Sequence, residues 1–256
     1  MTTRQYGEKD MPLFTVPYSH MDERDEALYY GTLDELLTYA NQALGILDEP
    51  SVSLHGDDER LLGYGAVVSE ELWRHRWVID DFVGTNPLGV TREHLEVARL
   101  WRHAVHDIFT CIDANADYAL YMNGRRVFAV GAMRGDADSH VHAIPSLMLL
   151  TLLPFRGGIV TDSKTFHLSS EPAPGALPLI ARQASELMGA GVVSTAAQLV
   201  AYERAHRGES QISRSCQRAI DAHLAQLRHL GEPSGTDQHD EGRAAARPSR
   251  NDTLGS

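Results

Sequence analysis

Metal-binding residue types alternate along one short segment, Gly135-Asp-Ala-Asp-Ser-His-Val-His142. Alternate side chains of an extended chain share one face, so four of them could converge on a single divalent cation. These four are Asp136, Asp138, His140 and His142. Imidazole and carboxylate together suit zinc, iron or manganese, which could activate a bound water for hydrolysis. The alternative is an exposed acidic loop, which we favour because one short segment would have to fix all four side chains.

A second group combines two arginines with two histidines at helical spacing: Arg99, Arg102, His103 and His106. Positions i, i+3, i+4 and i+7 lie on one face of a helix. Guanidinium groups bind phosphate and carboxylate through paired hydrogen bonds, so this face would be an anion-binding site. The alternative is a solvated helix face with local ion pairs, and the sequence favours that alternative.

Signatures of the common enzyme classes are absent from the sequence. It contains no Gly-x-Ser-x-Gly, no glycine-rich phosphate loop, no dinucleotide fingerprint and no His-Glu-x-x-His. The leading hypothesis is therefore an interaction or regulatory protein without catalytic activity and without a cofactor. A metal-dependent hydrolase built on the segment from Asp136 to His142 is the first alternative. Nucleic-acid binding through the C-terminal helices is the second, although those helices offer few side chains that read bases.

The formal net charge of −12 is concentrated at the start of the chain. Residues 1–60 hold 13 Asp and Glu against 4 Lys and Arg, a net charge of −9. This excess disfavours general DNA binding, because non-specific affinity comes from basic groups that neutralise phosphates. We expect the acidic first quarter, together with any exposed apolar face of a helix at 212–230, to meet a basic protein partner or a second copy of the chain.

Composition places the chain among ordinary globular proteins. Of its 256 residues, 43% are hydrophobic and 23% are charged, which is enough to bury one substantial core. Its two cysteines, Cys111 and Cys216, lie far apart and suggest a reducing cytoplasm. The first ten residues contain no apolar stretch typical of a secretion signal. The strong preference for arginine over lysine suggests a GC-rich bacterial genome.

The elements that position these groups centre on residues 147–168. The apolar run from Leu147 to Phe155 is too short to cross a bilayer as a helix, for which about 20 residues are needed, so it predicts a buried strand. Gly157-Gly158 can take the positive φ of a tight reversal into a second strand at 159–161, and Thr165 to Leu168 could add a third. We expect this hairpin to form the centre of the core.

The same region carries a resemblance. The phrase Leu152-Leu-Pro-Phe-Arg-Gly-Gly-Ile-Val-Thr-Asp162, with the upstream Asn86-Pro-Leu-Gly89, resembles a pattern in a group of uncharacterised bacterial proteins that share Leu-Pro-Phe-x-Gly-x-Ile-x-x-Asp. The resemblance covers about residues 75–195 and implies a shared fold. Some of those proteins end in a short cysteine-rich zinc motif, which this chain lacks, and Ser163 stands where glycine would be expected. No catalytic residue comes with the resemblance.

The full expectation is an α+β fold with a central antiparallel sheet of four or five strands packed with N-terminal and C-terminal helices. Residues 1–30 would form a flexible acidic arm and residues 231–256 a disordered tail. Between them, one domain would hold helices at 32–48, 69–83 and 91–112, a sheet at 117–168 and helices within 176–230. Asn123-Gly124 predicts a type I′ hairpin with Tyr121 opposite Arg126 and Leu120 opposite Val127.

Overall fold

The computed structural model describes residues 14–56, 58–133, 137, 141, 143–169 and 175–229. Within these ranges the chain forms seven helices and one sheet, which confirms the α+β class. The helices are α1 (Glu23–Leu44), α2 (Glu59–Arg74), α3 (Trp77–Thr85), α4 (Arg92–Trp101), α5 (Ala176–Gly189), α6 (Ala196–Ala205) and α7 (Arg214–His229). The strands are β1 (Val105–Ala114), β2 (Tyr118–Met122), β3 (Val127–Gly131), β4 (Ser146–Phe155), β5 (Gly158–Thr161), β6 (Phe166–Ser169) and β7 (Val192–Val193).

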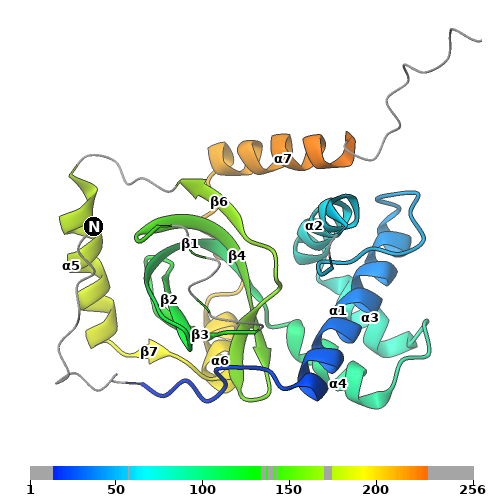
Figure 1. Ribbon diagram of the computed structural model, residues 1–256, viewed down its shortest axis with the longest axis horizontal. Helices are drawn as coiled ribbons and strands as arrows, with labels where there is room; N and C mark the ends of the chain where they lie inside the picture. Colours follow the sequence, from blue (N-terminus) through cyan, green and yellow to red (C-terminus); the bar gives the residue numbers. More distant parts are fainter. Residues whose placement is uncertain are drawn as a thin grey trace, which may run out of the picture.

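The sheet is strongly curved and lies between helices α1 to α4 on one side and helix α5 on the other (Figure 1). Its strand order is β5-β4-β1-β2-β3-β7, and β6 also pairs with β4. All described pairs are antiparallel except β3 with β7, so the sheet is mixed and has more strands than the four or five expected. Helices α1 to α4 form a layer at one end, α5 lies at the other, and α7 crosses beside α2 (Figure 1).

The predicted hairpin at the centre of the core is confirmed. Leu153 of β4 pairs with Val160 of β5. The earlier part of β4, from Leu147 to Leu149, pairs with β6. The reversal falls one residue earlier than expected, because Arg156 and Gly157 carry the positive φ angles of 47° and 89°. Every residue of β4 from Met148 onward is buried, which explains its near-continuous apolar sequence.

The predicted helix at 91–112 is wrong in its second half. Thr91 caps α4 as expected, but the helix ends at Trp101 and β1 begins at Val105. The segment after Ala104 is rich in β-branched and aromatic residues, and its burial alternates along the strand. Strand β1 pairs with both β2 and β4, so one row of its side chains is buried in the sheet. The same apolar side chains had been interpreted as the buried face of a helix.

The predicted flexible arm at 1–30 and the helix at 32–48 also need correction. Helix α1 begins at Glu23, because the side chain of Asp22 accepts a hydrogen bond from the Asp25 amide at 2.8 Å. Thr32, the expected cap, lies inside the helix and donates to the Leu28 carbonyl. The segment before α1 is packed too, since the ring of Tyr18 meets that of Phe155 edge to face. Residues 1–13 and the tail expected at 231–256 lie outside the described residues.

The helix predicted at 69–83 is two helices. Asp58 caps α2 ten residues earlier than expected, through hydrogen bonds from the amides of Arg60 and Leu61. The α-helix stops at Arg74 and resumes at Trp77. The helices expected within 176–230 are α5, α6 and α7. The short strand β7 lies between α5 and α6, and a connection without a helix or strand joins α6 to α7.

Helix α7 is amphipathic and its apolar side is covered. Ile220 and Leu224 are buried against Val67 of α2 and Leu149 of β4. The apolar face expected to be available to a partner is therefore used within the chain. No helix among the described ranges has the length and apolar character to traverse a bilayer.

The hairpin around Asn123-Gly124 forms, but its register and turn type differ from the expectation. Tyr121 pairs with Phe128 and Met122 with Val127, which leaves a four-residue connection. Type I′ turns need positive φ at both central residues, and among residues 123–126 only Gly124 has it, so this turn is not type I′. The Asn123 side chain organises it by accepting from the amides of Arg125 and Arg126.

Gly124→Val should still destabilise the protein, by about 1–3 kcal/mol from backbone strain alone. Gly124 has φ +81°, and an added Cβ would lie 2.9 Å from Nε2 of Gln211. The midpoint of thermal unfolding, followed by circular dichroism, measures the loss. Gly189→Ala is the matched control, since nothing lies within 4 Å of its added Cβ. Equal midpoints for the two variants would contradict the described turn.

Candidate functional site

The four residues of the predicted anion site do not share one face. Arg99 is exposed on α4, and Arg102, just past its end, forms an ion pair with Asp80 of α3. His103 reaches α6 and His106 reaches α2. They separate because β1 replaces the second half of the expected helix, and neighbouring strand residues point to opposite sides.

The four candidate metal ligands, Asp136, Asp138, His140 and His142, lie outside the described residues. Within the described ranges, no three side chains among His, Cys, Asp and Glu are arranged to hold a metal ion. The metal-site hypothesis therefore stays a prediction.

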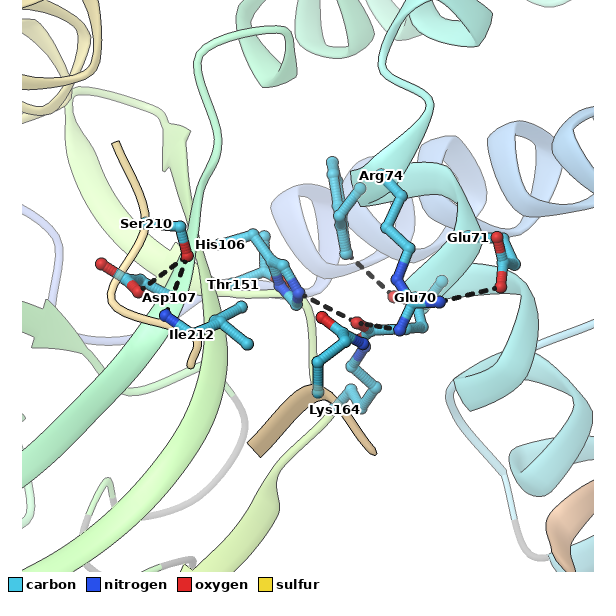
Figure 2. Close-up of polar contacts among 12 residues, drawn as sticks. Glu70, Glu71, Arg74, His106, Asp107, Thr151, Lys164, Ser210 and Ile212 are labelled. Atoms are coloured by element: carbon cyan, nitrogen blue, oxygen red, sulfur yellow. Dashed lines mark hydrogen bonds and ion pairs between the residues drawn. The ribbon is translucent and has the colours of Figure 1, made fainter. Parts of the chain in front are cut away.

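Glu70 of α2 is the centre of a buried polar cluster (Figure 2). Its Oε2 accepts from the Lys164 ammonium at 2.8 Å, and its Oε1 lies 3.2 Å from both His106 Nε2 and Arg74 Nη2. Only 1% of the Glu70 side chain and 7% of the Lys164 side chain are exposed. The cluster therefore joins α2, β1 and the connection between β5 and β6.

The electrostatics of this cluster favour the ionised carboxylate. Burial alone would raise the pKa of Glu70, but the hydrogen bond from His106 and the charge of Lys164 outweigh it. The pKa of Glu70 therefore lies well below its usual range. A buried charge with this many partners costs much less than an unpaired one, so the cluster depends on all its members being present.

The connectivity Thr151, His106, Glu70 is that of a nucleophile, a base and an acid. His106 Nδ1 lies 3.0 Å from the Thr151 hydroxyl, and its other ring nitrogen faces Glu70. Thr151 is fully buried in the middle of β4, so a substrate cannot reach its hydroxyl. We therefore interpret the cluster as structural.

A second buried carboxylate anchors the same helix. Asp162 Oδ2 accepts from the Ser69 hydroxyl at 2.9 Å and from the Trp73 indole N–H at 2.7 Å. Asp162 comes directly after β5, so this contact also fixes α2 on the end of the central hairpin. Ser69, Glu70 and Trp73 together present one polar side of α2 to the sheet.

Glu203 of α6 organises a separate ion network at the surface. Arg207 binds both of its oxygens, at 2.9 and 3.0 Å, and His103 Nδ1 lies 2.8 Å from Oε2. Arg76, between α2 and α3, approaches Oε1 at 3.5 Å. Burial would raise the pKa of Glu203, but these partners, Arg207 foremost, hold it below its usual range. The network joins α3, α6 and the start of β1.

A small polar cleft of about 40 Å3 opens beside this network. Its lining consists of Arg76, Ala104, Val105, His106, Asp107, Tyr202, Glu203, His206, Arg207, Gly208 and Glu209. Most of these side chains are arginine, histidine or carboxylate, so the recess is strongly polar. Such a cleft holds about three water molecules, at 10–15 Å3 for each. Its lining includes His106, one of the four residues of the predicted anion site.

The face around the cleft combines arginines with an exposed tryptophan. We call it the arginine-tryptophan face and define it by Arg76, Trp77, Arg102 and Arg207. The Trp77 side chain is 54% exposed, while Trp73 and Trp101 are buried. Arg102 contacts Asp80, one turn after Trp77 on α3, and Arg76 and Arg207 share Glu203. Arg76 and Arg207 therefore lie together at Glu203, and Arg102 lies beside α3.

Comparisons with protein families, with curated proteins and with solved structures found no match to this chain. The resemblance carried by the phrase at 152–162 therefore stays a prediction, and the site must be interpreted from its own geometry.

Sequence reasoning missed the acidic centres of both networks. Glu70 and Glu203 stand in ordinary amphipathic helices, and their partners are 94 and 100 residues away in the chain. One signal was available for Lys164, which is one of only two lysines and lies just after a buried strand. No comparable signal marked Arg76 or the exposure of Trp77.

Proposed function

We propose that the protein is a non-catalytic interaction or regulatory protein of the bacterial cytoplasm. Its binding surface is the arginine-tryptophan face, and its partner is a protein segment that carries acidic groups. Helix α7 does not supply this surface, because its apolar side is buried within the chain.

The exposure of Trp77 is the observation that carries this proposal. Tryptophan and arginine are the residues most enriched where protein interfaces gain their energy, because a large rigid ring and a forked cation bind with little loss of entropy. Trp77 is 54% exposed and directly follows Arg76 at the start of α3, the helix whose Asp80 binds Arg102. Two carboxylates pair with the arginines of the face: the Glu203 side chain is 5% exposed and the Asp80 side chain 55%, so three arginines are accessible beside one exposed carboxylate.

Local positive charge is compatible with the overall charge of −12. Residues 1–60 account for −9 of it, which leaves −3 for the remaining residues. Salt screens exposed charges beyond about 8 Å at physiological ionic strength, so a binding segment responds chiefly to the nearest side chains. A long nucleic acid spans many screening lengths of surface and meets more of the acidic excess.

Tryptophan fluorescence should report the charge of the face directly. Among the three tryptophans only Trp77 is exposed, so a soluble quencher acts mainly on it. We expect iodide to quench the emission more strongly than caesium, because the guanidinium groups attract the anion. Arg102→Gln should reduce iodide quenching, whereas Arg92→Gln, at the far end of α4, should not. Equal quenching by the two ions would contradict the proposed face.

Binding is tested by titrating the protein with a glutamate-rich peptide, with a lysine-rich peptide of equal length and with a single-stranded DNA oligonucleotide. The proposal expects the acidic peptide to shift Trp77 emission, with an affinity that falls as salt rises. Trp77→Phe should remove both the signal and most of the affinity. A response to the oligonucleotide alone would favour nucleic-acid binding, and a response to the lysine-rich peptide alone would move the binding surface to the acidic first quarter.

A further inference from the structure

We infer that the cleft lined by Arg76 and Arg207 is a binding site for a single carboxylate group, with Arg76 as its principal ligand. This inference rests on the proposed function and deepens it, since it names the chemical group through which the arginine-tryptophan face selects a peptide. The carboxylate belongs either to an acidic side chain or to the C-terminus of that peptide.

The acidic groups that line the cleft already have partners within the chain. Asp107 accepts hydrogen bonds from the Gln211 and Ile108 amides at 2.8 and 2.9 Å, and from the Ser210 hydroxyl at 3.3 Å. Glu209 lies 3.0 Å from Arg125 and 3.3 Å from His206. All three bonds of Asp107 go to its Oδ1, and burial raises the pKa of this carboxyl, which favours its neutral form. The oxygens of Glu203 are shared among His103 and arginines.

Arg76 is the lining cation whose pairing is weakest. Its guanidinium has an ion pair to Glu203 at 3.5 Å and a hydrogen bond from Nε to the Trp73 carbonyl at 3.4 Å. Both distances exceed the roughly 2.7–2.9 Å of a good charge-assisted hydrogen bond. Burial lowers the pKa of Arg76, Glu203 opposes that shift, and the neighbouring charge of Arg207 lowers it further. A half-buried guanidinium beside another cation is stabilised by an additional anion.

The size of the cleft limits that anion. A volume of about 40 Å3 admits the three heavy atoms of a carboxylate head in place of about three waters. A planar carboxylate can also accept two parallel hydrogen bonds from one guanidinium. His206 lines the same cleft, and its ring packs against that of Tyr202 with centroids 4.6 Å apart, which positions a second possible donor.

The position of Trp77 selects the group that lies next to the bound carboxylate. Trp77 comes directly after Arg76 and is exposed, so an apolar group beside the carboxylate can pack on the indole ring. The ligand class is therefore a peptide that carries a carboxylate beside an apolar side chain.

The first test is a titration with sodium acetate, followed by NMR of the arginine Nε–Hε signals in the full chain, with sodium chloride at equal ionic strength as the reference. We expect the Arg76 signal to shift in a saturable way and the Arg99 signal to stay unchanged. Arg76→Gln should remove the response, and Arg76→Lys should retain part of it. A titration in which acetate and chloride act alike would overturn the inference.

The second test uses three apolar peptides of one sequence: with a free C-terminus, with an amidated C-terminus, and amidated with one internal glutamate. Recognition of the C-terminus predicts binding of the first alone, whereas recognition of a side chain predicts binding of the third and equal affinities for the other two. Arg76→Gln should weaken the preferred peptide by about tenfold or more, and the exposed Arg99→Gln should leave it unchanged.

The two proposals fail in different ways. If acidic peptides shift Trp77 emission with equal affinity in wild type and Arg76→Gln, the face binds but the cleft does not select a carboxylate. If acetate shifts the Arg76 signal while no peptide affects Trp77, the cleft site stands and the proposed function fails. Circular dichroism of each variant, compared with wild type, separates loss of binding from loss of folding.

Discussion

Replacement of Glu70 by alanine should lower the free energy of unfolding by about 3–5 kcal/mol, the usual cost of breaking a buried ion pair. The loss arises because the Lys164 ammonium lies in a buried site and loses its carboxylate partner, which is 2.8 Å away in the wild type. His106 and Arg74 lose a common acceptor in the same step. Since proteins of this kind have only about 5–15 kcal/mol of stability, the variant should lose a large share of it. Urea unfolding followed by circular dichroism measures the change.

Glu71→Ala is the matched control, one residue along the same helix. Glu71 is 21% exposed and pairs with Arg74 at 3.2 Å, so its loss should cost about 1 kcal/mol or less. Glu70→Leu combined with Lys164→Met should recover much of the loss, because an apolar pair removes both buried charges. If Glu70→Ala and Glu71→Ala are equally stable, the buried cluster does not exist as described.

The same carboxylate predicts how stability depends on pH. The pKa of Glu70 is lowered in the folded protein, so the folded state binds the proton less readily than the unfolded state does. Its contribution is fully present above the pKa of an unfolded glutamate, about 4.3, and declines as pH falls below that value. Wild type should therefore lose stability in acid more steeply than Glu70→Gln.

Tyr29→Ala should be nearly as damaging, with a loss of about 3–5 kcal/mol for a large buried aromatic side chain. Tyr29 is fully buried, and its ring meets those of Trp101 and Phe155 at centroid distances of 5.4 Å each. Its hydroxyl donates to the Thr161 carbonyl, which links α1 to β5. Deletion of residues 1–30 would remove this side chain, so we expect that deletion to unfold the core.

Two substitutions separate the contributions of Tyr29. Tyr29→Phe keeps the ring and should cost about 1–3 kcal/mol, for a buried carbonyl left without its donor. Tyr30→Ala tests the half-buried neighbour, whose ring packs on His55, and should cost well under half as much as Tyr29→Ala. If Tyr29→Ala had the midpoint of wild type, the N-terminal region would be the loose arm that its sequence suggested.

Local sequence patterns predicted the parts of the fold that local forces decide. The hairpin of β4 and β5 was predictable because a continuous apolar run, a glycine pair and β-branched residues follow one another directly. Residues 105–112 were wrongly predicted as helix because their apolar residues fit helical and strand spacing about equally well. They form a strand because they pair with β2 and β4. For α1, a capping-box pattern at Thr32 concealed the cap at Asp22.

The candidate site was harder to predict from the sequence than the fold. Arg99, Arg102, His103 and His106 were predicted to share one helix face, but they lie in different environments. His106, Arg102 and His103 each contact a carboxylate of a different helix, α2, α3 and α6 respectively. Partners this distant leave no periodic trace in a single sequence, so the cleft and the exposure of Trp77 required three-dimensional placement.

The hydrogen bond between Tyr29 and Thr161 spans 132 residues, and this separation matters while the chain is being made. A ribosome adds about 5–20 residues per second, so roughly 7–26 s pass between the appearance of donor and acceptor. During that interval α1 can pack against α2, α3 and α4, but the positions of Leu153, Phe155 and Val160 in their shared core stay empty. The nascent N-terminal helices therefore present an apolar surface to chaperones until the central hairpin leaves the ribosome.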